Sequence, residues 1–425
     1  MAINQEKFTK DIQHTYFNKL PINIQKFLQE KYHLHRFSQQ DIRQLIEISV
    51  DLEMWKSKTL EEIWNKDLSS KYSGKKLKQE IIKDIKTFYD NLRNSPTSYS
   101  KEQKQKIKAP KIRLQEEERK DLGFGLCPVA SPKTRCCNLL TLDAVESCGY
   151  DCSYCSIQSF YGDGKITFDT TLKDKLKNIV LNEDEFYHIG TGQASDSLMW
   201  GNRFGVLDHL VEFAQKNPNV MLEFKTKSDN ISCFLDKDLP KNLLFTWSLN
   251  PQTIIDNEEH LTASLDERLN AAKKLHDRGY LVGFHFHPMI YFEGWRDEYG
   301  YIFQRLIRDF DPQKVALISL GTLTFIKPVI KQIRERDFKS KILQIPMINA
   351  SGKLSYPLEI KREMFKFAYD SLSLWHNRVY FYMCMEDQSL WKDVFGYEYP
   401  TNESFEMDMK LNYINKIESL NKYKE

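Results

Sequence analysis

Short apolar runs typical of β-strands alternate with amphipathic helical patterns through most of this chain, beginning near Asn138. The runs are rich in β-branched and aromatic residues, which favour strands, and most are separated by a helical stretch. Repetition of this kind implies parallel strands joined by right-handed crossovers. The pattern predicts strands at 138–145, 185–189, 220–224, 243–248, 281–286, 315–320 and 379–384, and helices at 172–180, 205–215, 265–278, 301–310 and 358–371.

We therefore expect an α/β fold built around a partial or complete (β/α) barrel of the TIM type, with its chemistry on loops at the carboxyl ends of the strands. His285 and His287 alternate within one predicted strand and so point to the same face. They either line the barrel, bind a metal or are satisfied core residues. The predicted domains are a helical, partly basic N-terminal region at 1–120, the barrel at 121–395 and a C-terminal helical tail at 396–425.

Three cysteines, Cys148, Cys152 and Cys155, follow the first predicted strand in a CxxxCxxC loop. A cubane iron-sulfur cluster has four iron corners that are usually held by cysteine thiolates, so this loop occupies three and leaves one iron open. A site built for chemistry keeps such a vacant position, whereas structural zinc sites close with four protein ligands. The spacing predicts a 4Fe-4S cluster that binds a substrate or cofactor at its fourth iron.

Structural zinc and unligated reduced thiols are the alternative interpretations of this loop. Zinc is less well supported, because neither a second CxxC pair nor a histidine pair follows at zinc-finger spacing. A disulfide framework fits poorly, since a chain of 425 residues with eight cysteines is not a small secreted scaffold, and Cys136 and Cys137 are adjacent.

The composition is that of an ordinary folded protein, with 41% hydrophobic and 28% charged residues and a net charge of +2. The first residues lack the basic start and apolar core of a secretory signal. No apolar run approaches the roughly 20 residues of a membrane-spanning helix. We expect a cytoplasmic protein with no membrane partner, in a reducing compartment that suits iron-sulfur chemistry.

The stretch from Lys71 to Lys120 is basic and has few acidic residues before Glu116. A basic arm of this kind can lie on nucleic-acid phosphates, where each neutralised phosphate releases a counterion. It can equally be a solvated helix face and linker. The basic residues are Lys75, Lys76, Lys78, Lys101, Lys104, Lys106, Lys108, Lys111 and Arg113.

Ordered segments between about residues 136 and 395 resemble the spore photoproduct lyase family, a branch of the radical SAM superfamily. The segments are GTGQASDSL at 190–198, FKTKS at 224–228, WSLNP at 247–251, TASLDER at 262–268, GYLVGFHFHP at 279–288 and EGW at 293–295. The resemblance implies a 4Fe-4S cluster on the three loop cysteines, with S-adenosylmethionine (SAM) at the fourth iron. It implies reductive cleavage of SAM to a 5′-deoxyadenosyl radical that takes a hydrogen atom from a substrate.

The resemblance also implies roles for individual residues. Tyr154 matches a tyrosine that takes part in the radical relay, and Lys227 suits the SAM carboxylate as a compact positive charge. The implied substrate is a damaged or modified nucleic-acid base, in DNA rather than RNA, that leaves the base stack to react. The implied electron donor is a reductant such as flavodoxin or ferredoxin. The positions that match SAM contacts are Gly190, Gly192, Ser195, Lys227, Ser248 and Asn250.

Two positions depart from the family pattern. Gln193 stands where the lyase has a hydrogen-donor cysteine, and a carboxamide does not give up a hydrogen atom readily. Ser156 replaces the tyrosine that follows the last cluster cysteine. Cys137 is our candidate donor, among the remaining thiols of Cys127, Cys136, Cys137, Cys233 and Cys384. Two other functions stay open: a radical SAM enzyme that modifies a peptide or small metabolite, and a non-enzymatic, metal-stabilised nucleic-acid-binding protein.

Overall fold

The computed structural model describes residues 2–99, 111–127, 133–156, 164–336, 338–350 and 352–422. The chain divides into two compact units, one of residues 1–99 with 325–348, the other of 100–324 with 349–425. The predicted lysines Lys101, Lys104, Lys106 and Lys108 lie outside the described residues.

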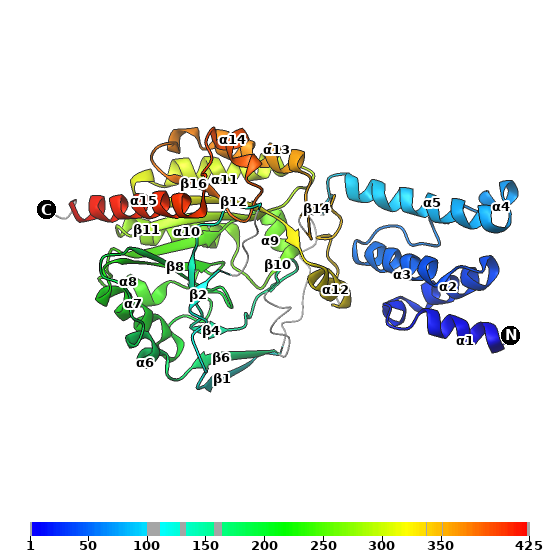
Figure 1. The fold of residues 1–425 in the computed structure, drawn as a ribbon, viewed down its shortest axis with the longest axis horizontal. Coiled ribbons are helices and arrows are strands. Elements are labelled where there is room, and N and C mark those ends of the chain that lie inside the picture. Colours follow the sequence, from blue (N-terminus) through cyan, green and yellow to red (C-terminus); the bar gives the residue numbers. More distant parts are fainter. Residues whose placement is uncertain are drawn as a thin grey trace. The chain divides into compact units, whose positions relative to one another are not determined.

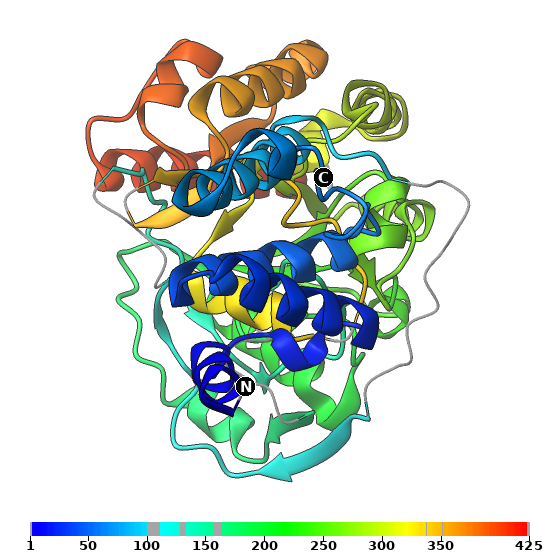
Figure 2. The same cartoon turned by 90° about the vertical axis from the view of Figure 1, so that its right-hand side faces the viewer.

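The first unit is helical, as the sequence predicts for this region, and its N-terminal helices are drawn in blue in Figure 2. A capping box begins α3, because Ser38 accepts from the Asp41 N–H while the Asp41 carboxylate accepts from the Ser38 N–H. The apolar side of α3, which includes Ile42, Leu45 and Ile46, is buried. Its helices are α1 (Ala2–Asp11), α2 (Ile22–His35), α3 (Gln39–Met54), α4 (Leu68–Lys71), α5 (Gly74–Asn94) and α12 (Lys327–Glu335).

An ion pair joins α12 to α3 within this unit. Arg334 of α12 binds the carboxylate of Asp51 on α3 through two hydrogen bonds, of 2.8 and 2.7 Å. The Tyr89 hydroxyl of α5 donates to the same carboxylate at 2.5 Å. The predicted single boundary at residue 120 did not anticipate that a later segment joins the helical unit, because no local pattern records this long-range pair.

The second unit is built on an eight-stranded sheet with the order β16-β12-β11-β9-β8-β7-β3-β2. All neighbouring pairs from β3 to β16 are parallel, and β2 runs antiparallel to β3. The sheet has two ends in this order, so the predicted barrel is confirmed in its partial, open form. The strands are β2 (Gly125–Leu126), β3 (Leu140–Leu142), β7 (Tyr187–Thr191), β8 (Val220–Thr226), β9 (Leu243–Ser248), β11 (Leu281–Met289), β12 (Val315–Thr322) and β16 (Tyr380–Met383).

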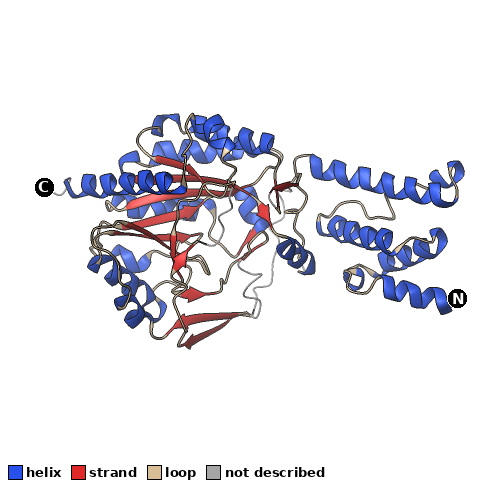
Figure 3. Cartoon of the chain, viewed as in Figure 1, coloured by secondary structure: helices blue, strands red, loops and turns tan. Residues whose placement is uncertain are grey.

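Helices flank this sheet, and Figures 1 and 3 show them around the strands. Apolar side chains on one face of the sheet meet them: Phe286 of β11, for example, packs on Phe303 of α11 with ring centroids 5.0 Å apart. The helices are α6 (Leu172–Lys177), α7 (Val206–Lys216), α8 (Ser232–Leu235), α9 (Gln252–Glu258), α10 (Leu265–Asp277), α11 (Trp295–Asp309), α13 (Leu358–Ser371), α14 (Ser389–Phe395) and α15 (Asn402–Lys422).

The C-terminal helix α15 packs at the amino ends of the strands. The Lys416 ammonium donates hydrogen bonds to the carbonyls of Pro312 and Arg378, at 2.6 Å each. These carbonyls lie just before β12 and β16 begin. Tyr413 lies against His188 of β7, with ring centroids 4.9 Å apart. The predicted helical tail at 396–425 is therefore a helix that packs on the barrel.

Shorter strands lie outside the eight-stranded sheet. Residues 113–117 form β1, although the sequence predicts a helical region to 120, because they pair in parallel with β6 about fifty residues later. The remaining short strands are β1 (Arg113–Glu117), β4 (Val145–Glu146), β5 (Asp151–Cys152), β6 (Lys165–Asp169), β10 (Glu259–His260), β13 (Thr324–Phe325), β14 (Ile348–Ala350) and β15 (Lys353–Ser355).

Candidate active site at the carboxyl ends of the strands

The register of the parallel sheet brings the predicted site residues onto one face. Paired residues on neighbouring strands point to the same side. Gly190 pairs with Glu223, and His285 pairs with Ser248. Glu223 accepts hydrogen bonds from Thr246 at 2.6 Å and contacts His285 Nε2 at 2.7 Å, so three strands share this face. We call it the inner face, because the helices α8, α10 and α11 cover the other one.

The cysteine loop is fixed to the segment that follows α9. Its short strand β5 pairs antiparallel with β10, which places Cys152 opposite Glu259. The Ser153 N–H donates to the Glu258 carbonyl at 2.8 Å, and the Cys155 N–H donates to the Cys152 carbonyl at 3.2 Å. Backbone pairing therefore holds the loop in place without using a cysteine side chain.

The three loop thiols influence one another electrostatically. Burial, followed by the charges of Asp196 and Cys155, raises the pKa of Cys148 to about 12. Burial raises the pKa of Cys152 well above its usual range, and Cys155 and Cys148 add to this rise. Iron would reverse this effect, because a coordinating thiol is deprotonated by the metal charge. None of the eight cysteines forms a disulfide.

No three His, Cys, Asp or Glu side chains in the described part of the chain are grouped closely enough to hold a metal ion. The assignment of Cys148, Cys152 and Cys155 as cluster ligands thus rests on the sequence and stays a prediction. The donor set itself, three thiols on one backbone-anchored loop beside a lysine, suits an iron-sulfur cluster.

Lys227 follows β8, and its side chain lies beside Tyr154 of the cysteine loop; its binding of the SAM carboxylate stays a prediction. Its ammonium lies 5.9 Å from the centre of the Tyr154 ring. Burial on its own lowers the pKa of Lys227, but Glu259 and the Cys152 thiol outweigh that effect and raise it. The ammonium has no hydrogen bond or ion pair with any described residue, so it can receive an anionic ligand.

Asp196 holds the backbone around Lys227, a role that sequence reasoning missed. One carboxylate oxygen accepts from the Leu198 and Met199 N–H groups at 3.0 Å each, and the other accepts from the Lys227 N–H at 2.7 Å. The Thr226 hydroxyl adds a further bond of 2.7 Å. Asp196 stands in the segment that resembles the family, but its role depends on a partner about thirty residues away.

The buried carboxylate of Glu259 contacts Tyr154 of the cysteine loop. It pairs with Arg268 at 2.6 Å, and neither side chain is exposed. It accepts hydrogen bonds from the Tyr154 hydroxyl and from the Asn250 amide, the latter at 2.8 Å. Burial alone would raise the pKa of Glu259, but the positive charges of Arg268 and Lys227 lower it to about 2. Glu259 is therefore ionised, and it orients Tyr154 at the cysteine loop.

The predicted SAM contacts occupy the inner face or the turn after it. Ser195 is 5% exposed, and its hydroxyl has no hydrogen-bond partner in the described part of the chain. Gly192 has a φ of 86°, which favours glycine, and a Cβ there would lie 2.5 Å from the Ser197 hydroxyl. The orphaned Ser195 hydroxyl and the Lys227 ammonium fit a polar cofactor such as SAM.

Ser248 and Asn250 sit where β9 ends, on the same face. The Ser248 carbonyl accepts from Arg268 at 2.8 Å. The Asn250 amide oxygen accepts from the Tyr299 hydroxyl at 2.6 Å, while its nitrogen donates to Glu259. Asn250 thus supports the carboxylate network, and its direct contact with SAM stays a prediction.

The candidate hydrogen donor Cys137 lies in a second group of thiols. A hydrogen bond between Cys136 and Cys137 lowers the pKa of Cys136 to about 6. The same bond, with burial, raises the pKa of Cys137 well above its usual range. The charge of Cys384, which follows β16, also raises the pKa of Cys137.

Two other residues singled out in the sequence lie in different environments. Gln193 is exposed, and Trp295 is a core residue, 5% exposed.

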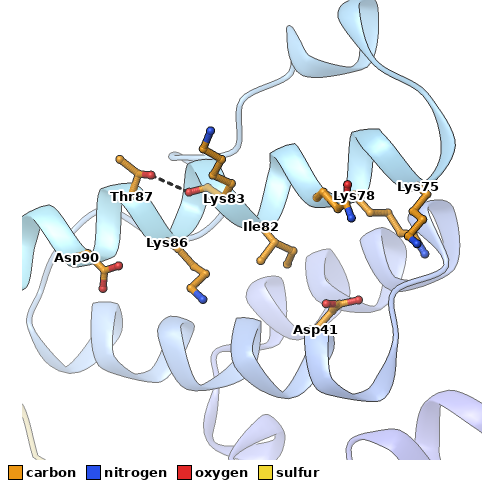
Figure 4. Close-up of a pocket in the computed structure, with 9 residues that line it drawn as sticks. Asp41, Lys75, Lys78, Ile82, Lys83, Lys86, Thr87 and Asp90 are labelled. Atoms are coloured by element: carbon orange, nitrogen blue, oxygen red, sulfur yellow. Dashed lines mark hydrogen bonds between the residues drawn. The ribbon is translucent and has the colours of Figure 1, made fainter. Parts of the chain in front are cut away.

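A separate basic groove lies in the helical unit, between α3 and α5 (Figure 4). It has a volume of about 610 Å³ and is lined by four lysines of α5 together with Asp41 and Asp90. Lys78 donates to the Arg36 carbonyl at 3.1 Å. The other three lysines have no ion pair among the described residues. The four are Lys75, Lys78, Lys83 and Lys86.

Comparison with known proteins decides the family. The family model for spore photoproduct lyase matches residues 58–347, more than half of the chain. The chain belongs to the spore photoproduct lyase family. The resemblance inferred from the sequence segments is thereby confirmed.

Curated spore photoproduct lyases are distant relatives. The chain is 26% identical to that of Geobacillus sp. (strain Y412MC61) over 202 residues, which cover 46% of this chain and 59% of the relative. It is 23% identical to that of Clostridium acetobutylicum over 282 residues, which cover 61% and 79%. The first of these matches therefore spans less than two thirds of the relative.

Solved spore photoproduct lyase structures share the fold. A mutant lyase with bound AdoMet and dinucleoside spore photoproduct has a TM-score of 0.56 and 24% identity, covering 64% of this chain and 82% of that one. A lyase complexed with dinucleoside spore photoproduct matches with the same values. A search of the described helices finds none that is both long and apolar enough to cross a membrane.

Proposed function

We propose that this protein is a radical SAM enzyme that acts on a damaged or modified base in nucleic acid, most simply in DNA. Membership of the spore photoproduct lyase family supports this function. The observation that carries it is Lys227 beside the cysteine loop at the carboxyl ends of parallel strands, held by Asp196 next to Ser195, whose buried hydroxyl has no hydrogen-bond partner among the described residues.

The residues of the site have distinct tasks in this proposal. Cys148, Cys152 and Cys155 would hold a 4Fe-4S cluster, and Lys227 and Ser195 would bind SAM beside it. When bound, this pair of cofactors supplies a 5′-deoxyadenosyl radical that removes a hydrogen atom from the substrate. Glu259 fixes the position of Tyr154 within the loop. Cys137 is proposed as the hydrogen donor, because Gln193 stands where the lyase has its donor cysteine. Asp196 fixes the turn that presents Lys227.

A basic surface, an electron donor and a cellular setting complete the proposal. The lysines of the α5 groove supply positive charge that suits nucleic-acid phosphates. A one-electron reductant such as flavodoxin or ferredoxin would reduce the cluster. Eight cysteines without a disulfide suit the reducing cytoplasm.

Anaerobic reconstitution tests the enzymatic claim. We expect the protein to bind four iron atoms per chain and, with dithionite, to convert SAM to 5′-deoxyadenosine. Cys152→Ala should abolish both, whereas Cys233→Ala, which changes a cysteine on α8, should leave both intact. Iron-loaded protein that turns over no SAM would contradict the proposal.

A further inference from the structure

Two polar side chains stand out on the inner face below Lys227. In β8 every residue is buried except Lys225, which is half-buried, and in β11 the same holds for His287. Lys225 pairs with Thr246, whose hydroxyl reaches Glu223. His287 is two residues beyond His285, which reaches the same carboxylate. Both side chains therefore point to the inner face and keep part of their surface accessible there.

Neither group has a partner within the described ranges. The Lys225 ammonium makes no hydrogen bond or ion pair there, and the His287 ring makes no hydrogen bond. Glu223, whose charge acts on Lys225, is already occupied by His188 at 2.8 Å and by His285 at 2.7 Å. An ammonium in a buried position is costly when it lacks a counter-charge. The two groups thus offer donors that the described residues leave unused.

Gly321 of β12 lies directly beside the His287 ring and leaves space for it. A Cβ at Gly321 of β12 would come within 2.7 Å of the His287 ring, so no other residue fits there without displacing the imidazole. Met383 pairs with Leu320, which puts Cys384 beside Gly321 on the same face. His287, Gly321 and Cys384 therefore form one row across three strands.

The electrostatics of this region favour an anion. Burial lowers the pKa of the Lys225 ammonium. The charges of Cys384, Glu223 and Cys127 raise this pKa, and the charge of Lys227 lowers it, so that the net direction is down. Burial and the neighbouring Lys225, His285, Lys227 and Lys361 all lower the pKa of His287. An anion placed between the two groups would favour their protonated forms and supply the missing hydrogen-bond acceptors.

We propose that Lys225 and His287 bind a phosphodiester of the substrate, the one that links the reacting nucleoside to its neighbour. This inference rests on the proposed function, since it takes the substrate to be nucleic acid. Lys225 of β8 is two residues before Lys227, which directly follows the strand, a separation of about 7 Å along the chain. A phosphate held there would lie next to the position where the base meets the radical. Lysine is a common phosphate ligand because it acts as a point charge.

Two matched ligands test this site: a thymidine dinucleotide with a natural phosphodiester, and the same dinucleotide with an uncharged methylphosphonate linkage. Calorimetric titration of the intact wild-type protein should show about tenfold tighter binding of the charged ligand, equal to about 1.4 kcal/mol. Lys225→Met should remove that preference and leave binding of the uncharged ligand unchanged. Lys173→Met, at an exposed lysine of α6, is the matched control and should keep the preference.

The outcomes separate the site from the proposed function. A tenfold preference that survives in Lys225→Met would overturn the anion site. If Lys225→Met fails to fold, His287→Gln replaces it: a reduced preference supports the site, and an unchanged one overturns it. SAM cleavage is measured separately, so protein that cleaves SAM but shows no preference loses only the anion site. Protein that shows the preference but never cleaves SAM loses the enzymatic proposal.

Discussion

Replacing Glu259 by glutamine should loosen the cysteine loop. Glu259 is fully buried, pairs with Arg268 at 2.6 Å and accepts bonds from Tyr154 and Asn250. Its pKa is lowered to about 2, against roughly 4.3 for an unperturbed glutamate. At 1.36 kcal/mol per pKa unit this corresponds to about 3 kcal/mol of stabilisation at neutral pH. Removing one partner of a buried pair costs about 3–5 kcal/mol, which agrees.

Native-state hydrogen exchange measures this loss of stability at the cysteine loop itself. The Ser153 N–H, bonded to the Glu258 carbonyl at 2.8 Å, reports opening of the loop. In Glu259→Gln its protection at pH 7 should fall by about a hundredfold, the factor that corresponds to about 3 kcal/mol. The control is Glu212→Gln, which removes an exposed carboxylate paired with Lys216 and should change protection less than about threefold.

The pH dependence has a definite sign. Because the folded-state pKa of Glu259 is lowered, its contribution to stability is complete above the unfolded pKa of about 4.3 and is lost as pH falls toward 2. The difference between wild type and Glu259→Gln should therefore shrink over that range. A difference that stays constant from pH 7 to pH 3, or one no larger than that of Glu212→Gln, would refute the reasoning.

Three further outcomes are expected. Lys227→Ala should weaken SAM binding by at least tenfold in equilibrium dialysis without changing iron content, and unchanged affinity would show that this lysine does not meet the SAM carboxylate. Asp51→Ala should lower the free energy of unfolding of the helical unit by about 3 kcal/mol in urea, because it leaves the Arg334 charge buried and unpaired, and a loss below 1 kcal/mol would count against that pair. Since the hydrogen bond from Cys137 lowers the pKa of Cys136 to about 6, alkylation of Cys136 should rise with pH around that value. Cys137→Ala should shift the rise to higher pH, and an unshifted profile would exclude the hydrogen bond as its cause.

Much of the barrel could be predicted from the sequence because its strands and helices are defined by local periodicity. Each predicted strand from 185–189 to 379–384 is present, with bounds within a few residues. Strand β1 could not be predicted, since Arg113 to Glu117 carry no strong pattern and become a strand only by pairing with β6. The position of α12 depends likewise on Arg334 meeting Asp51.

The sequence alone determined the chemical character of the protein: three thiols at CxxxCxxC spacing, a lysine after a strand, and ordered segments shared with one family. These are properties of residue type and spacing, which the linear chain states directly. Only the tertiary structure decided which groups are paired. It assigned Glu259 to Arg268 and Tyr154, and it left Lys225 and His287 on the inner face without a hydrogen-bond partner among the residues that the structure describes. Pairing depends on strand register and on contacts between residues far apart in the chain, and neither is encoded in any local stretch.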